Sequence, residues 1–271
     1  MKYSQQGLLA SQIASLRIVS AGLVFLPFAI FHITKIPRKK LGVVVLTGVF
    51  GNLLPAFLFA IAIAKNIDSS LAGILNSLTP ICVVVIAILF FKDRIKSQKI
   101  IGVLVGFAGL LLLTLTQENI SLDNFGYALL IVLGTVFYGI NVNLVSHYLK
   151  ELNPVQVATV SLAFMTIPTA LVLWQQGFFQ IDISDPIIRW SVIASVLLGI
   201  VGSAFATALF YVLVQKAGGL FASLVTYGIP FVALFWGFIY GEKITLIEVA
   251  CLGIILAGVY LTNRPNGKKG I

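Results

Sequence analysis

The chain has 271 residues, of which 59% are hydrophobic and only 10% are charged, and its formal net charge is +9. A soluble fold could not keep so much apolar surface out of water, so the composition excludes a soluble domain and indicates a protein that spans a membrane. The basic residues stand in short clusters between apolar segments, where lipid headgroups attract them. We therefore predict the lipid bilayer as a partner and no binding of nucleic acid.

Nine apolar segments of nearly bilayer-spanning length follow one another with short connections. Charged clusters, prolines, and Asn or Asp residues separate them. The predicted spans are residues 11–33, 41–63, 70–91, 99–116, 125–147, 155–175, 190–213, 220–240 and 246–262. The expected fold class is an all-α polytopic membrane protein with nine transmembrane helices.

The charges of the connections alternate along the chain. Thirteen of the 18 Lys and Arg residues fall on one side of the membrane, in segments such as 35–40 and 92–99, and four fall on the other side. Connections rich in Lys and Arg stay in the cytoplasm. The basic tail 264–271, and with it the C-terminus, is therefore predicted to be cytoplasmic.

Two of the prolines within the predicted spans, Pro80 and Pro230, lie in sequences that correspond to each other. Pro80 lies in NSLTPICVVVIAILFFKDR and Pro230 in TYGIPFVALFWGFIYGEK. Further pairs at nearly the same separation are Phe59 with Phe210, Gly48 with Gly199, Gly51 with Gly202, and QIASLRIV at 12–19 with QVATVSLA at 156–163. A repeat unit of five helices has an odd number of crossings, so its second copy crosses the membrane in the opposite direction. The pattern predicts two inverted-topology repeats.

On these residues the chain resembles the EamA-type transporters of the drug/metabolite transporter superfamily. The resemblance rests on AGILNSLTPICVVVIAILFFKDRIKSQKIIGVLVGFAGLLLL at 72–113 and on ASLVTYGIPFVALFWGFIYGEKITLIEVACLGIILAGVYL at 222–261. It implies EamA-like repeats at 1–117 and 125–263. It also implies ten helices, so the first repeat is expected to lack the helix that would precede residue 11.

The same resemblance implies a function and a location. We expect a transporter of the bacterial inner membrane that exports small organic metabolites, such as amino acids or related compounds, by alternating access between the repeats. A small molecule is therefore the expected substrate. The alternatives are a non-transporting membrane scaffold or receptor, and a truncated, inactive transporter.

Polar side chains inside the spans are the candidates for a substrate cavity. A proline in a transmembrane helix frees a backbone carbonyl about one turn earlier, here near Asn76 and Thr226. The resulting bends either serve packing alone or open a cavity toward which polar side chains turn, because they would be unfavourable against lipid. The residues expected to line this cavity are Asn52, Asn76, Thr79, Tyr138, Asn141, Tyr211, Thr226 and Tyr227, with Pro80 and Pro230 as the helix kinks.

Two polar positions have alternative interpretations. Asn141 and Asn143 are two residues apart, so on a helix they point in different directions, and we expect one of them to bind a neighbouring helix. Arg17 lies about two turns inside the first span. We interpret it as reaching the headgroups at the outer surface, with the binding of an anionic substrate as the alternative.

Some residue types are missing from the spans. No Asp, Glu, Lys or His falls in the middle of a predicted span. Proton-driven transporters commonly use such a group, so the sequence favours a facilitator or an exchanger. We also find no convergent nucleophile and base and no metal-ligand spacing around Cys82 or Cys251, so we expect neither an enzyme nor a metal or other cofactor.

Glycines recur at a spacing of four residues in two of the spans. They lie in GVLVGFAGLL at 102–111 and in GIILAG at 253–258. Small residues at this spacing let helix backbones approach closely. The pattern predicts packing seams within one chain or between two copies, which leaves a homodimer through these helices open.

Overall fold

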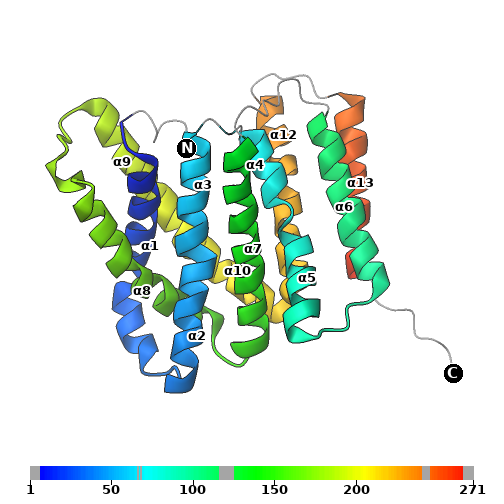
Figure 1. Cartoon of the computed structure of the whole chain (residues 1–271), viewed down its shortest axis with the longest axis horizontal. Coiled ribbons are helices and arrows are strands. Elements are labelled where there is room, and N and C mark those ends of the chain that lie inside the picture. Colours follow the sequence, from blue (N-terminus) through cyan, green and yellow to red (C-terminus); the bar gives the residue numbers. More distant parts are fainter. Residues whose placement is uncertain (1–6, 66, 68, 116–124, 240–244, 265–271) are drawn as a thin grey trace.

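The computed structural model describes residues 7–65, 67, 69–115, 125–239 and 245–264. Within these residues the chain is helical without strands, and nine helices are long and apolar enough to cross a membrane. The helices stand side by side and run alternately in opposite directions (Figure 1). The predicted all-α polytopic fold is confirmed.

Five of the nine spans are single α-helices. They are α1 (Ala10–Ile33), α6 (Ser97–Leu115), α7 (Phe125–Tyr148), α8 (Pro154–Gln175) and α13 (Leu246–Asn263). Each predicted span coincides with one of the nine helices to within a few residues at either end.

The other four spans are interrupted. They are α2 (Arg38–Gly48), η2 (Val49–Leu53) and α3 (Leu54–Ala64); α4 (Ser69–Asn76) and α5 (Thr79–Phe91); α9 (Pro186–Gly199), η4 (Ile200–Phe205) and α10 (Ala206–Ala217); and α11 (Gly219–Ser223), η5 (Leu224–Gly228) and α12 (Ile229–Ile239). The short 3-10 helix η3 (Phe178–Gln180) lies between α8 and α9. Two of the interruptions are π-helical and one is a 3-10 turn.

Local sequence explains where two of the helices begin. Asn153 and Asp185 each accept a hydrogen bond in their side chain from the backbone N–H two residues later, at 2.9 and 2.8 Å. A proline follows each of them in the first turn, where its missing N–H costs nothing.

The connection around Asn153 belongs to the end of the bundle at which α1 ends and α2 begins, drawn at the bottom of Figure 1. We call this the basic end, after Lys and Arg residues such as those in 35–40 and 92–99.

The helix is interrupted just before each of the two corresponding prolines, Pro80 and Pro230. Pro80 has no N–H to offer the carbonyl of Asn76, and the hydroxyl of Thr79 donates to that carbonyl instead, at 2.6 Å. Before Pro230 the chain adopts the 3-10 turn η5, and the backbone N–H of Ile229 donates to the carbonyl of Thr226. The carbonyls that the prolines release are thus bound locally in both halves.

The two halves of the chain show corresponding features in opposite directions. The helix pair α4 and α5 runs toward the basic end, whereas α11, η5 and α12 run away from it (Figure 1). The π-helical turns also correspond, because η2 follows Gly48 and η4 follows Gly199. A π-helical turn contains an extra residue that shifts the facing of the following helix, and such turns are frequent at functional sites.

The glycine-rich helices α6 and α13 pack against each other within the chain. A Cβ atom at Gly258 would overlap the backbone of Gly102 and Gly106, so α13 could not approach α6 this closely with any larger residue. By contrast, Gly253 faces open space on the outside of the same helix. These glycines thus form a packing seam within one chain, which is one of the two arrangements predicted from their spacing.

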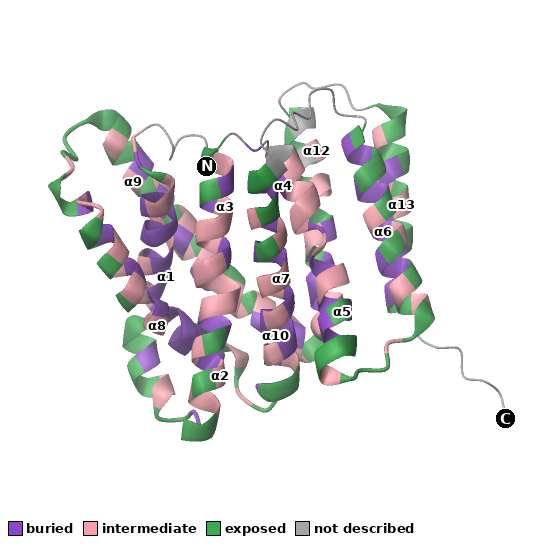
Figure 2. Cartoon of the chain, viewed as in Figure 1, coloured by how far each residue is buried: buried purple, intermediate pink, exposed green. Residues whose placement is uncertain are grey.

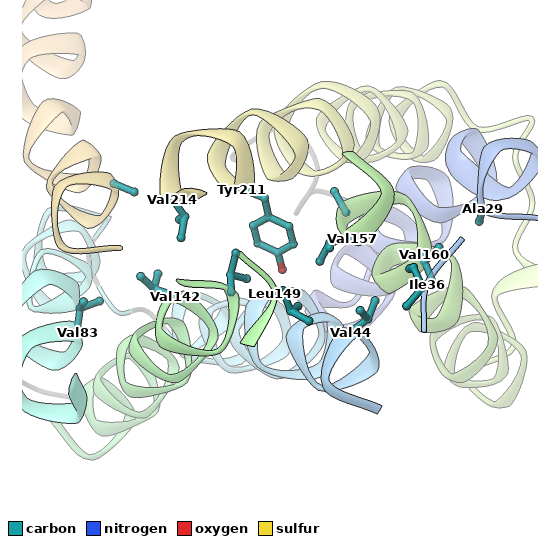
Figure 3. Packing of buried hydrophobic residues seen from close by; sticks show 13 residues of the cluster. Ala29, Ile36, Val44, Val83, Val142, Leu149, Val157, Val160, Tyr211 and Val214 are labelled. Carbon is teal, nitrogen blue, oxygen red and sulfur yellow. The ribbon is translucent and has the colours of Figure 1, made fainter. Parts of the chain in front are cut away.

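Buried aliphatic side chains fill the bundle at the basic end. They come from α2, α7, α8, α10 and neighbouring segments, and include Val44, Val142, Val145, Leu149, Val157, Val160 and Val214. Tyr211 points from α10 into this group (Figure 3). We call it the apolar cluster. Buried residues continue through the centre of the bundle, whereas the outer helix faces are exposed, as expected of surfaces that meet lipid (Figure 2).

Candidate substrate cavity

A cavity of about 660 Å³ opens between the helices near the middle of their length. Asn52, Thr79, Thr207 and Thr226 contribute to its wall, and each lies near the centre of its own span. The cavity is adjacent to the apolar cluster, because Val142 and Tyr211 belong to both. Its volume falls in the range of small-molecule sites, about 300–1,000 Å³.

Seven of the eight predicted residues come together in the wall of this cavity. They are Asn52, Asn76, Thr79, Tyr138, Asn141, Tyr211 and Thr226. The two halves of the chain both contribute, from η2 and the break between α4 and α5 in the first half and from α7, α10 and η5 in the second.

Tyr227 is the exception, because it lies outside the cavity. Its buried hydroxyl donates to the carbonyl of Val103 on α6 at 2.9 Å, and its ring packs on Gly106. Thr226 and Tyr227 are consecutive in the 3-10 turn η5, where neighbouring side chains point about 120° apart. Only one of the two can therefore face the cavity, and it is Thr226.

Hydrogen bonds orient the polar side chains of the wall. The hydroxyl of Tyr211 donates to Asn141 Oδ1 at 3.1 Å and lies 3.4 Å from the carbonyl of Thr47. Asn143 points elsewhere, and its Nδ2 donates to the carbonyl of Val83 on α5 at 3.1 Å and to that of Gly139 at 2.9 Å. Asn143 thus binds a neighbouring helix, as expected for one of the two asparagines.

Arg17 is placed differently from our interpretation. Its side chain turns into the cavity wall instead of reaching the headgroups, and Nη2 donates to Ser203 Oγ at 3.4 Å. Ser203 lies in the π-helical turn η4, directly across from α1, which packs along η4 and α9. The inward contact is available because η4 turns a hydroxyl toward α1 at this level.

Three buried polar atoms in the wall have no hydrogen-bond partner among the described residues. They are Arg17 Nε, Asn52 Nδ2 and Asn76 Oδ1. The first two are donors and the third is an acceptor. Buried polar atoms are normally paired, so a pocket that gathers such atoms is suited to binding a small polar molecule.

The sequence held one signal that we did not use. GVFGN at 48–52 and GIVGS at 199–203 are corresponding segments, and they form the π-helical turns with Asn52 and Ser203 in the same place. Aligning these two segments would have added Ser203 to the cavity residues. No pattern within the first span alone indicates the direction of the Arg17 side chain.

A second hollow, of about 740 Å³, lies at the basic end. Arg94, Lys96 and Lys99 line it together with an ion pair between His147 Nε2 and Asp93, 3.0 Å apart. Phe91 stacks on the His147 ring at 4.2 Å between centroids. In the part of the chain that the structure describes, no group of three His, Cys, Asp or Glu residues is arranged to hold a metal ion.

Comparison with known proteins assigns the chain to a family. The model of the EamA-like transporter family matches residues 1–115 and 125–264 of this chain. The chain is 28% identical over 267 residues to an uncharacterized transporter of Archaeoglobus fulgidus, covering 97% of this chain and 92% of the relative.

Other matches are more distant. The chain is 25% identical over 198 residues to Protein PagO of Salmonella typhimurium, covering 72% of this chain and 64% of PagO. It is 23% identical over 274 residues to a chloroplastic WAT1-related protein of Arabidopsis thaliana, covering 94% and 63%. A solved structure described only as "Crystal structure of protein" shares the fold, with a TM-score of 0.69, 17% identity and coverage of 97% of this chain and 90% of that one. Because the family match extends over both halves of the sequence, the chain belongs to the EamA-like transporter family.

Proposed function

We propose that the protein exports small organic metabolites, such as amino acids or related compounds, across a bacterial inner membrane by alternating access. The observation that carries this proposal is the cavity near the middle of the helices, to which both halves of the chain contribute polar side chains. In transporters built from inverted repeats, the substrate site lies at this depth, at interrupted helices where the repeats meet. The family assignment supports the transporter class.

Alternating access requires that the cavity opens to one side of the membrane at a time. The apolar cluster fills the bundle between the cavity and the basic end, and several of its members are fully buried. We interpret this arrangement as a state closed toward the basic end. In the alternate state the helices that meet at the apolar cluster, α2, α7, α8 and α10, separate.

The basic end is the cytoplasmic end in this proposal. Connections rich in Lys and Arg remain in the cytoplasm, and Arg38, Lys40, Arg94 and Lys96 all lie at this end. The C-terminal helix α13 ends there at Asn263, which gives the C-terminus a cytoplasmic location.

The composition of the cavity wall bears on the energy source. Among the described residues that line the cavity, Arg17 is the charged one, and none is a carboxylate or a histidine. A membrane-embedded carboxylate or histidine usually carries the proton in proton-coupled transporters. We therefore propose facilitated diffusion or exchange in preference to proton-driven pumping.

Transport can be tested with protein reconstituted into vesicles. Candidate substrates come from a metabolite-wide comparison of the medium of cells with and without the protein, and each is then tested for counterflow in proteoliposomes. Ala56 lines the cavity, so Ala56→Trp should fill it and abolish counterflow. Leu104→Trp places the same side chain on an exposed face of α6 and serves as the matched control. Absence of counterflow for every candidate with the wild-type protein would support the scaffold or receptor alternative.

A further inference from the structure

The charged residue of the cavity wall suggests what kind of substrate the cavity accepts. We propose that Arg17 binds the single carboxylate of a substrate inside this cavity. The inference deepens the transport function proposed above and rests on it for its biological role, but it concerns binding and can be tested without transport.

Arg17 has no counterion in the part of the chain that the structure describes. The two ion pairs found there, Lys40 with Glu151 and Asp93 with His147, are both at the basic end. Arg17 instead lies in the other half of α1, within a span. A charge at this depth is unfavourable unless a partner compensates it, so a missing partner in the protein points to one in the ligand.

The hydrogen bonds of Arg17 are also incomplete. Its contact with Ser203 Oγ is long, at 3.4 Å, and its buried Nε has no acceptor among the residues that the structure describes. A guanidinium presents five N–H donors in a planar fork that matches a carboxylate. Most of this donor capacity is therefore free to bind an anion that enters the cavity.

The second repeat provides an internal comparison. The segment at 12–19 corresponds to that at 156–163, which places Ser161 at the position of Arg17. Ser161 is fully buried on α8, and its hydroxyl donates to the carbonyl of Ala158 in its own helix. The corresponding helix thus forms and packs with a small neutral residue at this position. The repeat fold does not require an arginine here, which favours a function for Arg17 in binding.

The charge of the site indicates a single carboxylate group. Arg17 supplies one positive charge, and the other described residues that line the cavity are neutral. A phosphate monoester carries a charge of about −1.5 to −2 at neutral pH and would leave negative charge uncompensated. A carboxylate carries a single charge, and the free Nδ2 of Asn52 can contribute one more donor to it.

The other residues of the cavity wall indicate which further groups the substrate carries. Asn76 Oδ1 is a buried acceptor with no donor in the described part of the chain, and it suits a hydroxyl or ammonium donor of the substrate. Apolar side chains such as Phe59, Leu209 and Ile229 provide contact surface for a hydrocarbon body. The inferred substrate class is a monocarboxylate that carries a hydrogen-bond donor and an apolar portion.

Binding to the purified, full-length protein tests this inference. The probes are L-amino acids, lactate and benzoate, each compared with its carboxamide, which keeps the skeleton but lacks the carboxylate. Ligand-induced shifts in thermal unfolding give the affinities. We expect at least one carboxylate to bind the wild-type protein more tightly than its amide. Arg17→Gln should lower the affinity for that carboxylate about tenfold or more and leave the affinity for the amide unchanged.

Control variants distinguish the effect of the Arg17 charge in the cavity from the effect of removing any positive charge from the protein. Arg189→Gln removes an exposed arginine of α9, near the other end of the bundle, and should leave carboxylate affinity unchanged. Arg17→Lys should keep part of the preference. If Arg17→Gln does not fold, protection of Arg17 from phenylglyoxal by the bound carboxylate can be mapped by mass spectrometry in the wild-type protein. Wild-type protein that binds none of the carboxylates, an unchanged preference in Arg17→Gln, or an absence of protection would each overturn the inference.

The two proposals fail in different ways. Arg17-dependent carboxylate binding without movement of any solute in proteoliposomes would contradict transport and leave the anion site standing. Counterflow of solutes that lack a carboxylate, without Arg17-dependent binding, would contradict the anion site and leave transport standing.

Discussion

The hydroxyl of Thr207 donates a hydrogen bond to Asn52 Oδ1 at 3.1 Å and thereby joins the two halves of the chain across the cavity. Asn52 lies in η2, and Thr207 lies at the start of α10, directly after η4. The nitrogen of the Asn52 amide, Nδ2, is buried and has no hydrogen-bond partner within the described ranges of the chain. The hydrogen bond from Thr207 thus fixes the orientation of the Asn52 amide, and with it the direction of the Nδ2 donor.

Replacing Thr207 with valine should remove this hydrogen bond and keep nearly the same side-chain shape. We expect Thr207→Val to lower the free energy of unfolding by about 0.6 kcal/mol, the average for an interhelical hydrogen bond in a membrane. It should also weaken substrate binding, because the Asn52 amide is no longer held. Titration with SDS in mixed micelles measures the stability. In an Asn52→Leu background the same replacement should have almost no effect, so additive effects of the two changes would contradict the coupling.

Tyr211 connects the cavity to the apolar cluster, and its hydroxyl can be removed without removing its ring (Figure 3). Tyr211→Phe abolishes the bonds to Asn141 and the Thr47 carbonyl, and we expect a loss of about 1 kcal/mol in the free energy of unfolding. The state closed at the basic end should lose stability in particular. Amide hydrogen exchange of residues 142–148 on α7 should then become faster, whereas the exposed control Tyr260→Phe should leave it unchanged. Unchanged exchange in Tyr211→Phe would separate this tyrosine from closure.

Much of the fold could be predicted because the membrane restricts the possibilities. Apolar length determines a span, so all nine spans were found, and the breaks before Pro80 and Pro230 follow from the missing N–H of proline. Seven cavity residues were found for a similar reason, since a polar side chain within a span avoids lipid and turns inward.

The remaining features depend on local backbone geometry that composition does not reveal. The 3-10 turn η5 separates the directions of Thr226 and Tyr227, and a helical wheel of regular α-geometry cannot show this. The direction of Arg17 depends on Ser203, which the π-helical turn η4 presents to α1. A long side chain can reach either headgroups or a cavity, and only the packing of the neighbouring helix selects between them.

The two glycines of α13 provide a matched pair for the packing seam. Gly258→Ala would place its Cβ against the backbone of Gly102 and Gly106, so we expect α6 and α13 to separate and the free energy of unfolding to fall by about 1–3 kcal/mol. Gly253→Ala adds the same methyl group to open space on the same helix and should be neutral or slightly stabilising. Thermal unfolding of both variants in one detergent makes the comparison. Equal effects at the two positions would contradict the seam.

The orientation proposed for the bundle predicts which connections are accessible from outside the cell. Thr34 at the basic end and Ser184 at the other end are both exposed, and cysteine is similar in size to the residue at either position. In a background without Cys82 and Cys251, a membrane-impermeant maleimide should label Ser184→Cys in intact cells and Thr34→Cys only after permeabilisation, because basic connections stay in the cytoplasm. Labelling in the reverse order would invert the orientation and place the C-terminus outside.

The break at Pro80 allows a test by loss and rescue. Thr79→Val removes the hydroxyl that binds the Asn76 carbonyl, and since Pro80 has no N–H, that carbonyl is left without its donor in an apolar surrounding. We expect a loss of about 1 kcal/mol in the free energy of unfolding. Adding Pro80→Ala supplies a backbone N–H four residues after Asn76 and should restore the lost stability.

The rescued variant should nevertheless differ from the wild type in function. Closing the gap at Ser77 and Leu78 continues α4 into α5 as one regular helix and turns Asn76 and Thr79 relative to the cavity. The double variant Thr79→Val/Pro80→Ala should therefore unfold like the wild-type protein in SDS and yet show reduced counterflow in proteoliposomes. Full counterflow together with restored stability would mean that the interruption serves packing alone, which is the first of the two interpretations that the sequence left open.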